Sequence, residues 1–135
     1  MADSFSVSTA ALEAFRGLSA RIISETTARA LAKSEDVAQH GADAPHLIAS
    51  GIQFTVRMLD AAMASGEDSL LEDELHWALD RLPNDGVSAE QILSRFAMMR
   101  EVVNGCIPPG PAAEVVAAVR WMERRLRELA ARRTG

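Results

Sequence analysis

Residues 111–129 read PAAEVVAAVRWMERRLREL, and this stretch decides the fold class. Its large apolar residues recur at alternating intervals of four and three, at Val115, Val119, Met122, Leu126 and Leu129. Such spacing places an apolar stripe along one side of an α-helix. The near-heptad period predicts that this helix packs on a neighbouring helix at a shallow crossing angle.

The segment before it predicts a second helix, whose start carries the sharpest signal in the chain. Ser88 and Gln91 have the spacing of a capping box, and Val87 and Ile92 have that of a hydrophobic staple. The helix is predicted to end at Gly105, and a rigid PPGP connector at 108–111 leads into the last helix. The further apolar residues of its buried face are Phe96, Met99 and Val103.

Three more helices are predicted towards the N-terminus, at 9–33, 45–65 and 69–82. The helix at 45–65 has the widest apolar arc, so it is expected to be the most buried. The SLLE sequence at 69–72 has the form of a capping box. Residues 34–44 are predicted to form a loop, and residues 1–8 a flexible N-terminal tail. We therefore expect one all-α domain over 9–133, with five main helices plus short turns.

Composition supports a helical domain and limits its partners. Of 135 residues 24 are alanine, and aromatic residues make up only 4%; strands would favour aromatic and β-branched side chains. The net charge of −5 argues against a general nucleic-acid-binding surface. The charge is uneven, because residues 60–90 hold nine acidic residues against Arg81, whereas 120–133 hold six arginines against two glutamates. This basic segment is either a docking surface or a solvated helix face.

The cellular location of the protein is predicted from its cysteine content and its apolar runs. Cys106 is the single cysteine, which fits a reducing compartment. The N-terminal residues lack the basic start and apolar run of a signal peptide. No stretch approaches the roughly 18 apolar residues that a membrane span needs. We expect a cytoplasmic protein that does not act at a membrane.

Few residues are candidates for chemistry, since phosphate-binding, zinc-protease and nucleophile-elbow motifs are all missing from the sequence. We therefore expect no enzymatic activity and no cofactor. Glu72, Asp73, His76 and Asp80 share one helix face and could bind a divalent metal, or they could form a solvated acidic face. His76 is also a candidate haem ligand. Cys106, in a predicted loop, is either a chromophore attachment site or a structural cysteine.

Other residues point to association with a protein. Trp77 and Trp121 are expected to lie off the main apolar faces of their helices, and exposed tryptophan is common at interfaces. Arg124 and Arg125, in the basic last helix, are further candidates for an interaction surface. The methionines suit either a binding cavity or the filling of an aromatic-poor core.

Residues 61–82 (AAMASGEDSLLEDELHWALDRL), 86–90 (GVSAE) and 107–109 (IPP) follow a helix–turn–helix–proline–helix succession. Over about 45–130 this succession resembles the haem-independent, globin-like N-terminal sensor domains of stressosome and related bacterial signalling regulators. It is also similar to helical segments that accompany cobalamin-binding sensor domains. The resemblance implies a globin-like fold, dimerisation through the last helices and signalling to a protein partner. It carries over no ligand residue, and His76 matches the globin histidine only in approximate position.

Together these observations predict a non-catalytic sensory or regulatory domain that acts through protein–protein contacts, as a homodimer and with a partner from a signalling pathway. One alternative is a carrier of a small molecule or chromophore of the haem, bilin or cobalamin type. A second alternative is a metal-dependent helical-bundle enzyme.

Overall fold

The computed structural model describes residues 5–33, 37, 38 and 40–134, and in this part of the chain it contains helices and turns but no strand. The all-α prediction is confirmed. Six α-helices lie wholly within the described residues: α1 (Thr9–Gly17), α2 (Ser19–Leu31), α4 (Ala44–Ser65), α5 (Ser69–Arg81), α6 (Ala89–Cys106) and α7 (Pro109–Thr134). Two 3-10 turns, Gly41–Asp43 and Leu82–Asp85, precede α4 and follow α5.

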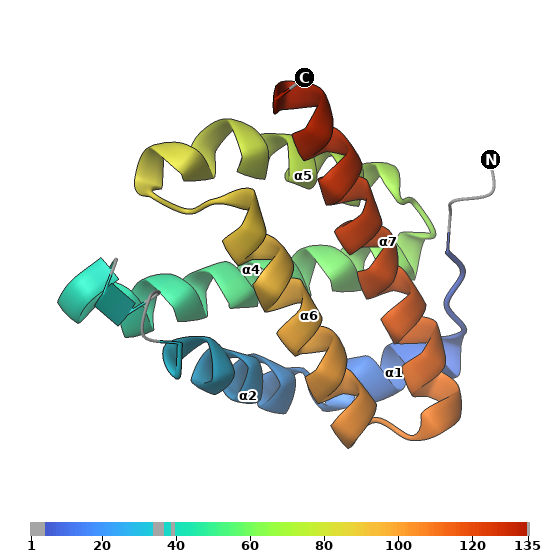
Figure 1. Ribbon diagram of the computed structural model, residues 1–135. Coiled ribbons are helices and arrows are strands. Elements are labelled where there is room, and N and C mark those ends of the chain that lie inside the picture. Colours follow the sequence, from blue (N-terminus) through green and yellow to red (C-terminus); the bar gives the residue numbers. More distant parts are fainter. Residues whose placement is uncertain (1–4, 34–36, 39, 135) are drawn as a thin grey trace.

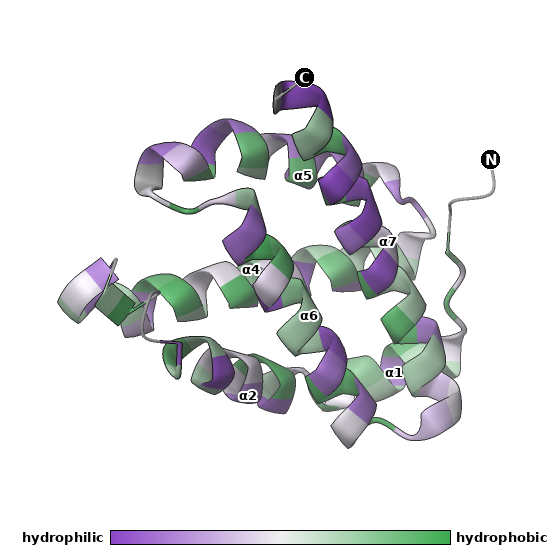
Figure 2. Cartoon of the chain, viewed as in Figure 1, coloured by the Kyte–Doolittle hydropathy of each residue, from purple (hydrophilic) through white to green (hydrophobic). Residues whose placement is uncertain are grey.

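The two C-terminal helices form one side of the molecule. Figure 1 shows α6 and α7 beside each other, joined by a short turn and crossing the other helices. Behind them, α2 packs on α4 and α6, while α5 contacts both α4 and α7. The hydrophilic residues of α7 gather towards its C-terminal end, near α5 (Figure 2). No helix among the described residues combines the length and the apolarity that crossing a membrane would require.

The apolar stripe of α7 lies in the core, as predicted. Val115, Val119 and Leu126 are fully buried, and Met122 and Leu129 nearly so. The predicted face of α6 is also buried, and it consists of Ile92, Phe96, Met99 and Val103. The helix start at Ser88 is confirmed in detail. The Ser88 hydroxyl accepts the Gln91 N–H at 3.1 Å, and the Ser88 N–H donates to Gln91 Oε1 at 2.9 Å.

The single helix predicted at 9–33 is two helices, so the described part of the chain has six α-helices where five were expected. The break lies at Leu18, whose φ of −112° and ψ of 7° are not helical. Its N–H bonds to the Phe15 carbonyl, three residues back, at 3.2 Å. The apolar spacing continues across this bend, with Phe15 and Ile22 both fully buried. Periodicity alone therefore gave no sign of the break.

The capping box predicted at Ser69 is also wrong. The helix α5 is preceded by Asp68, and no side chain caps its start. The Glu72 carboxylate, which a capping box would direct to the backbone, is instead bound by Arg125 of α7.

The predicted N-terminal tail is partly fixed against α7. The Phe5 ring contacts the ring of Trp121 at 5.8 Å between centroids. The Ser8 N–H donates to the Glu114 carboxylate at 2.7 Å. Residues 1–4 of the tail, and 34–36 and 39 of the predicted loop, lie outside the described residues.

Candidate functional site: an apolar groove between α4 and α5

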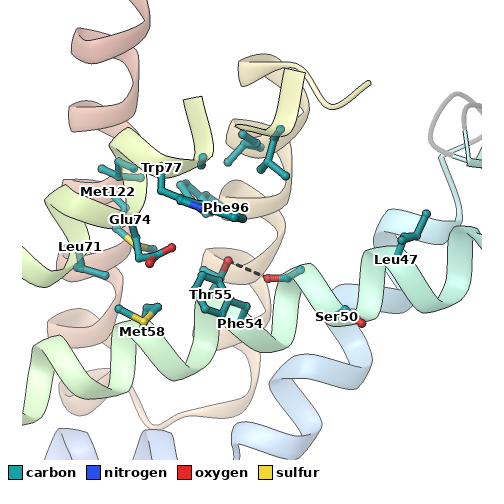
Figure 3. A pocket seen from close by; sticks show the side chains of 15 residues that line it. Leu47, Ser50, Phe54, Thr55, Met58, Leu71, Glu74, Trp77, Phe96 and Met122 are labelled. Carbon is teal, nitrogen blue, oxygen red and sulfur yellow. Dashed lines mark hydrogen bonds between the residues drawn. The ribbon is translucent and has the colours of Figure 1, made fainter. Parts of the chain in front are cut away.

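A groove of about 320 Å³ lies between α4 and α5, with α6 and α7 behind it. Figure 3 shows side chains of α4 and α5 directed towards this space. We call it the α4–α5 groove. Its lining residues are Leu47, Ser50, Gly51, Phe54, Thr55 and Met58 of α4, Leu71, Glu74, Leu75, Trp77 and Ala78 of α5, and Leu82, Ile92, Phe96 and Met122.

The groove exists because α4 is apolar over a wider arc than the core needs. Ile48, Ile52 and Leu59 fill the core, whereas Leu47 and Phe54 lie on the neighbouring edge of the helix and line the groove. Both residues are exposed, so the expectation that α4 is the most buried helix is wrong for this edge. The width of the arc was a signal that the sequence offered for a binding surface.

Large exposed apolar side chains are concentrated at the groove. Among the described residues these are Val37, Leu47, Phe54 and Trp77, and all except Val37 line it. Phe54 and Trp77 are 42% and 46% exposed, with ring centroids 6.1 Å apart and the rings tilted by 49°. A contiguous exposed apolar patch on a small domain is typical of an interaction site.

Glu74 is the one ionisable side chain among the described residues that line the groove. Its carboxyl is half-buried, and this burial, followed by the charge of neighbouring Asp73, raises its pKa above the ordinary value. An ionised carboxylate in such surroundings is stabilised by a hydrogen-bond donor or a cation. Sequence reasoning missed Glu74, because nothing in the α5 sequence distinguishes it from its acidic neighbours.

Three of the four candidate metal ligands, Glu72, His76 and Asp80, form an ion-pair network with α7. Arg125 binds Glu72 through two hydrogen bonds, Nε to Oε1 at 2.6 Å and Nη2 to Oε2 at 2.7 Å. These bonds lower the pKa of the Glu72 carboxyl, and His76 adds a 3.2 Å contact to the same carboxylate. Asp80 is paired with Arg133.

Two of the three proposed carboxylate ligands are thus occupied by arginines, and the third, Asp73, is exposed. Within the described residues no three His, Cys, Asp or Glu side chains converge as a metal site would require. Glu72, His76 and Asp80 serve to join α5 to α7. A metal centre has no geometric support at these positions.

The other predicted site residues do not line the groove. Cys106 is the last residue of α6 rather than part of a loop, and burial raises the pKa of its half-buried thiol. His76 is exposed on the edge of α5 that faces α7. Neither residue is among those that line the groove.

The four residues predicted to form an interaction surface lie in different surroundings. Trp121 is only 6% exposed and packs on Phe5, so the expectation that it lies off the apolar face is wrong. Arg125 forms ion pairs with Glu72 and Glu128. Arg124 is exposed on α7. Trp77 alone of the four lines the groove.

Comparisons of the chain with models of protein families, with curated proteins and with solved structures find no match. The resemblance to globin-like sensor domains therefore stays a prediction.

Proposed function

We propose that this chain is a non-catalytic regulatory domain that acts through protein–protein contact, and that its partner binds at the α4–α5 groove. The observation that carries the proposal is the gathering of Leu47, Phe54 and Trp77 around one open apolar groove. The resemblance seen in the sequence supports a role within a bacterial signalling pathway, and the single cysteine, Cys106, fits the reducing environment of the cytoplasm.

The chemistry of the lining favours binding over reaction. A carboxyl such as Glu74 acts in general acid–base catalysis together with a second group, a nucleophile or base, within hydrogen-bond reach. The other described lining residues are apolar, apart from the small hydroxyls of Ser50 and Thr55. The Thr55 hydroxyl is already bonded to the Gly51 carbonyl at 3.1 Å. The groove thus offers apolar area, a few neutral polar groups and one carboxyl group.

The strength of contact that the groove supports is moderate. Fully burying a large apolar side chain contributes about 1.5–3 kcal/mol, and Leu47, Phe54 and Trp77 are each already about half covered. These three anchors would then contribute roughly 2–5 kcal/mol, and further contacts around the groove must add to this to offset the cost of association. Such a contact is reversible, as a regulatory interaction requires. The sulfur side chains of Met58 and Met122 let the lining adapt to a partner.

A second candidate function is a small-molecule carrier, and the volume of the groove favours it. About 320 Å³ falls within the range of small-molecule sites. Because His76 and Cys106 lie elsewhere, the ligand would be held without an axial histidine or a thioether bond. Native mass spectrometry of the purified protein would detect it as an added mass that is lost on unfolding.

Site-specific photo-crosslinking tests the main proposal. Benzoylphenylalanine is placed at Phe54 in the groove and, as a matched control, at Glu13, an exposed residue of α1. In cells that produce the chain, we expect position 54 to form a discrete polypeptide adduct and position 13 to form none. No polypeptide adduct from position 54, or equal adducts from both positions, would overturn the proposal.

A further inference from the structure

The outward edge of α5 carries an ordered arrangement of charges around Trp77. Core residues Leu71 and Leu75 define one side of the helix, and Glu72, His76 and Asp80 define a second side, facing the arginines of α7. Glu74, Trp77 and Arg81 follow at intervals of three and four, so they share a third side. This third side borders the α4–α5 groove.

The two charged residues of this edge, Glu74 and Arg81, differ from those on the second side in their pairing. Glu74 and Arg81 are seven residues apart and form no ion pair with any described residue. The Arg81 guanidinium lies over the Trp77 ring, 5.9 Å from its centroid. The edge therefore presents a half-buried anion, an exposed aromatic ring and an exposed cation in a row.

This row is complementary to itself. The midpoint between positions 74 and 81 falls between Trp77 and Ala78, so a two-fold axis there would bring two α5 helices together antiparallel. Each Glu74 would then face Arg81 of the other copy, and every favourable contact would occur twice, as in any isologous interface. A parallel pairing would set like charges opposite each other. The small side chain of Ala78 at the axis permits a close approach of the helices.

We propose that a second copy of this chain is the polypeptide that binds at the α4–α5 groove, through an antiparallel two-fold contact of α5 in which Glu74 of each copy pairs with Arg81 of the other. This inference rests on the proposed function and names its partner. The contact covers Trp77 and the neighbouring Phe54, which are among the most exposed large apolar residues of the described chain. It also supplies a cation to the Glu74 carboxylate.

A charge exchange tests the pairing by sedimentation equilibrium of the full chain over a wide concentration series. Wild type is expected to be a reversible dimer. Glu74→Arg and Arg81→Glu should each raise the dimer Kd by about tenfold or more, because each sets like charges face to face. The double variant Glu74→Arg/Arg81→Glu should return the Kd to near the wild-type value, since the pairs are restored with the charges exchanged.

Matched controls apply the same charge changes away from the row. Glu67→Arg, before α5, and Arg127→Glu, on the exposed side of α7, should leave the dimer Kd within about twofold of wild type. Circular dichroism of each variant establishes that the helices are retained. A monomeric wild type, a double variant as weak as the single ones, or equally weakened controls would each overturn the inference.

The two proposals fail in different ways. A polypeptide adduct from position 54 with a mass other than that of this chain, together with a monomeric wild type, overturns the self-pairing and leaves the groove as a protein-binding surface. A complete lack of adducts at position 54 overturns the proposed function itself.

Discussion

Removing Arg100 should destabilise the domain far more than removing an exposed arginine. Arg100 of α6 binds Glu123 of α7 through two hydrogen bonds, Nε to Oε2 at 2.8 Å and Nη2 to Oε1 at 3.0 Å. The Glu123 side chain is only 5% exposed, whereas that of Arg100 is 24% exposed. In Arg100→Met the carboxylate keeps its burial but loses its cation, which is the costly case for a buried ion pair.

The size of the effect follows from this geometry. Breaking a fully buried pair costs about 3–5 kcal/mol, and because Arg100 reaches solvent we expect about 2–3 kcal/mol for Arg100→Met. For a domain of this length the loss corresponds to roughly 10 °C in Tm. Urea unfolding followed by circular dichroism measures it, with the midpoint lowered by about 1 M or more.

Two further variants separate the ion pair from simple loss of packing. Arg100→Met/Glu123→Met replaces both charges by apolar groups and should recover to within about 1 kcal/mol of wild type. Arg29→Met breaks the exposed Arg29–Glu101 pair, of which the side chains are 46% and 64% exposed, and should cost less than about 1 kcal/mol. The buried ion pair would not be the cause if Arg100→Met cost no more than Arg29→Met, or if the double variant were as unstable as Arg100→Met.

Three other predictions follow from the helix starts and the perturbed groups. Ser88→Ala removes a capping hydrogen bond and should lower the free energy of unfolding by about 1 kcal/mol. Ser69→Ala removes no cap and should change the free energy of unfolding by less than about 0.5 kcal/mol. Equal losses for the two variants in urea unfolding would contradict this difference between the two helix starts. Burial raises the pKa of Glu74 in the folded state, so the folded chain holds this proton more tightly and loses stability as pH rises through that pKa. In dilute solution Glu74→Gln should therefore be slightly more stable than wild type at neutral pH, by less than about 1 kcal/mol. This difference in stability should vanish at pH values well below the ordinary pKa of a carboxyl group. A Glu74→Gln variant that is less stable at neutral pH would show that the carboxylate is stabilised within the monomer. Because burial also raises the pKa of Cys106, its thiol in the folded chain should react with an aromatic disulfide reagent more slowly than a free cysteine at the same pH. The reaction should become faster after unfolding. Rapid reaction of the folded chain would instead indicate an activated thiol.

Local signals in the sequence predicted most of the helices correctly. Ser88 and Gln91 lie within one turn, so their spacing specifies the cap without knowledge of the rest of the chain. The stripe from Val115 to Leu129 needs only the helical period, and all its members are buried. The same reasoning failed at Leu18, because a bend can preserve the apolar spacing while changing the backbone angles.

The groove and the α5–α7 network could not be predicted in the same way, because each depends on which helices become neighbours. Glu72 and Ser69 have the spacing of a capping box, and only the placement of Arg125, 53 residues later, shows why Glu72 takes another role. The exposure of Trp77 was expected, whereas Trp121 is buried in the core and contacts Phe5 of the distant N-terminal segment. Glu74 differs from its acidic neighbours in α5 because it lines the groove, and the groove forms only when α4 packs beside α5.

Binding of a polypeptide at the α4–α5 groove can be tested by the mass of the photo-crosslinked species formed at position 54. We expect a discrete adduct whose added mass equals that of a second copy of this chain, and no such adduct from position 13. Failure of position 54 to form any polypeptide adduct, under conditions in which the probe is intact and the chain is folded, would contradict it.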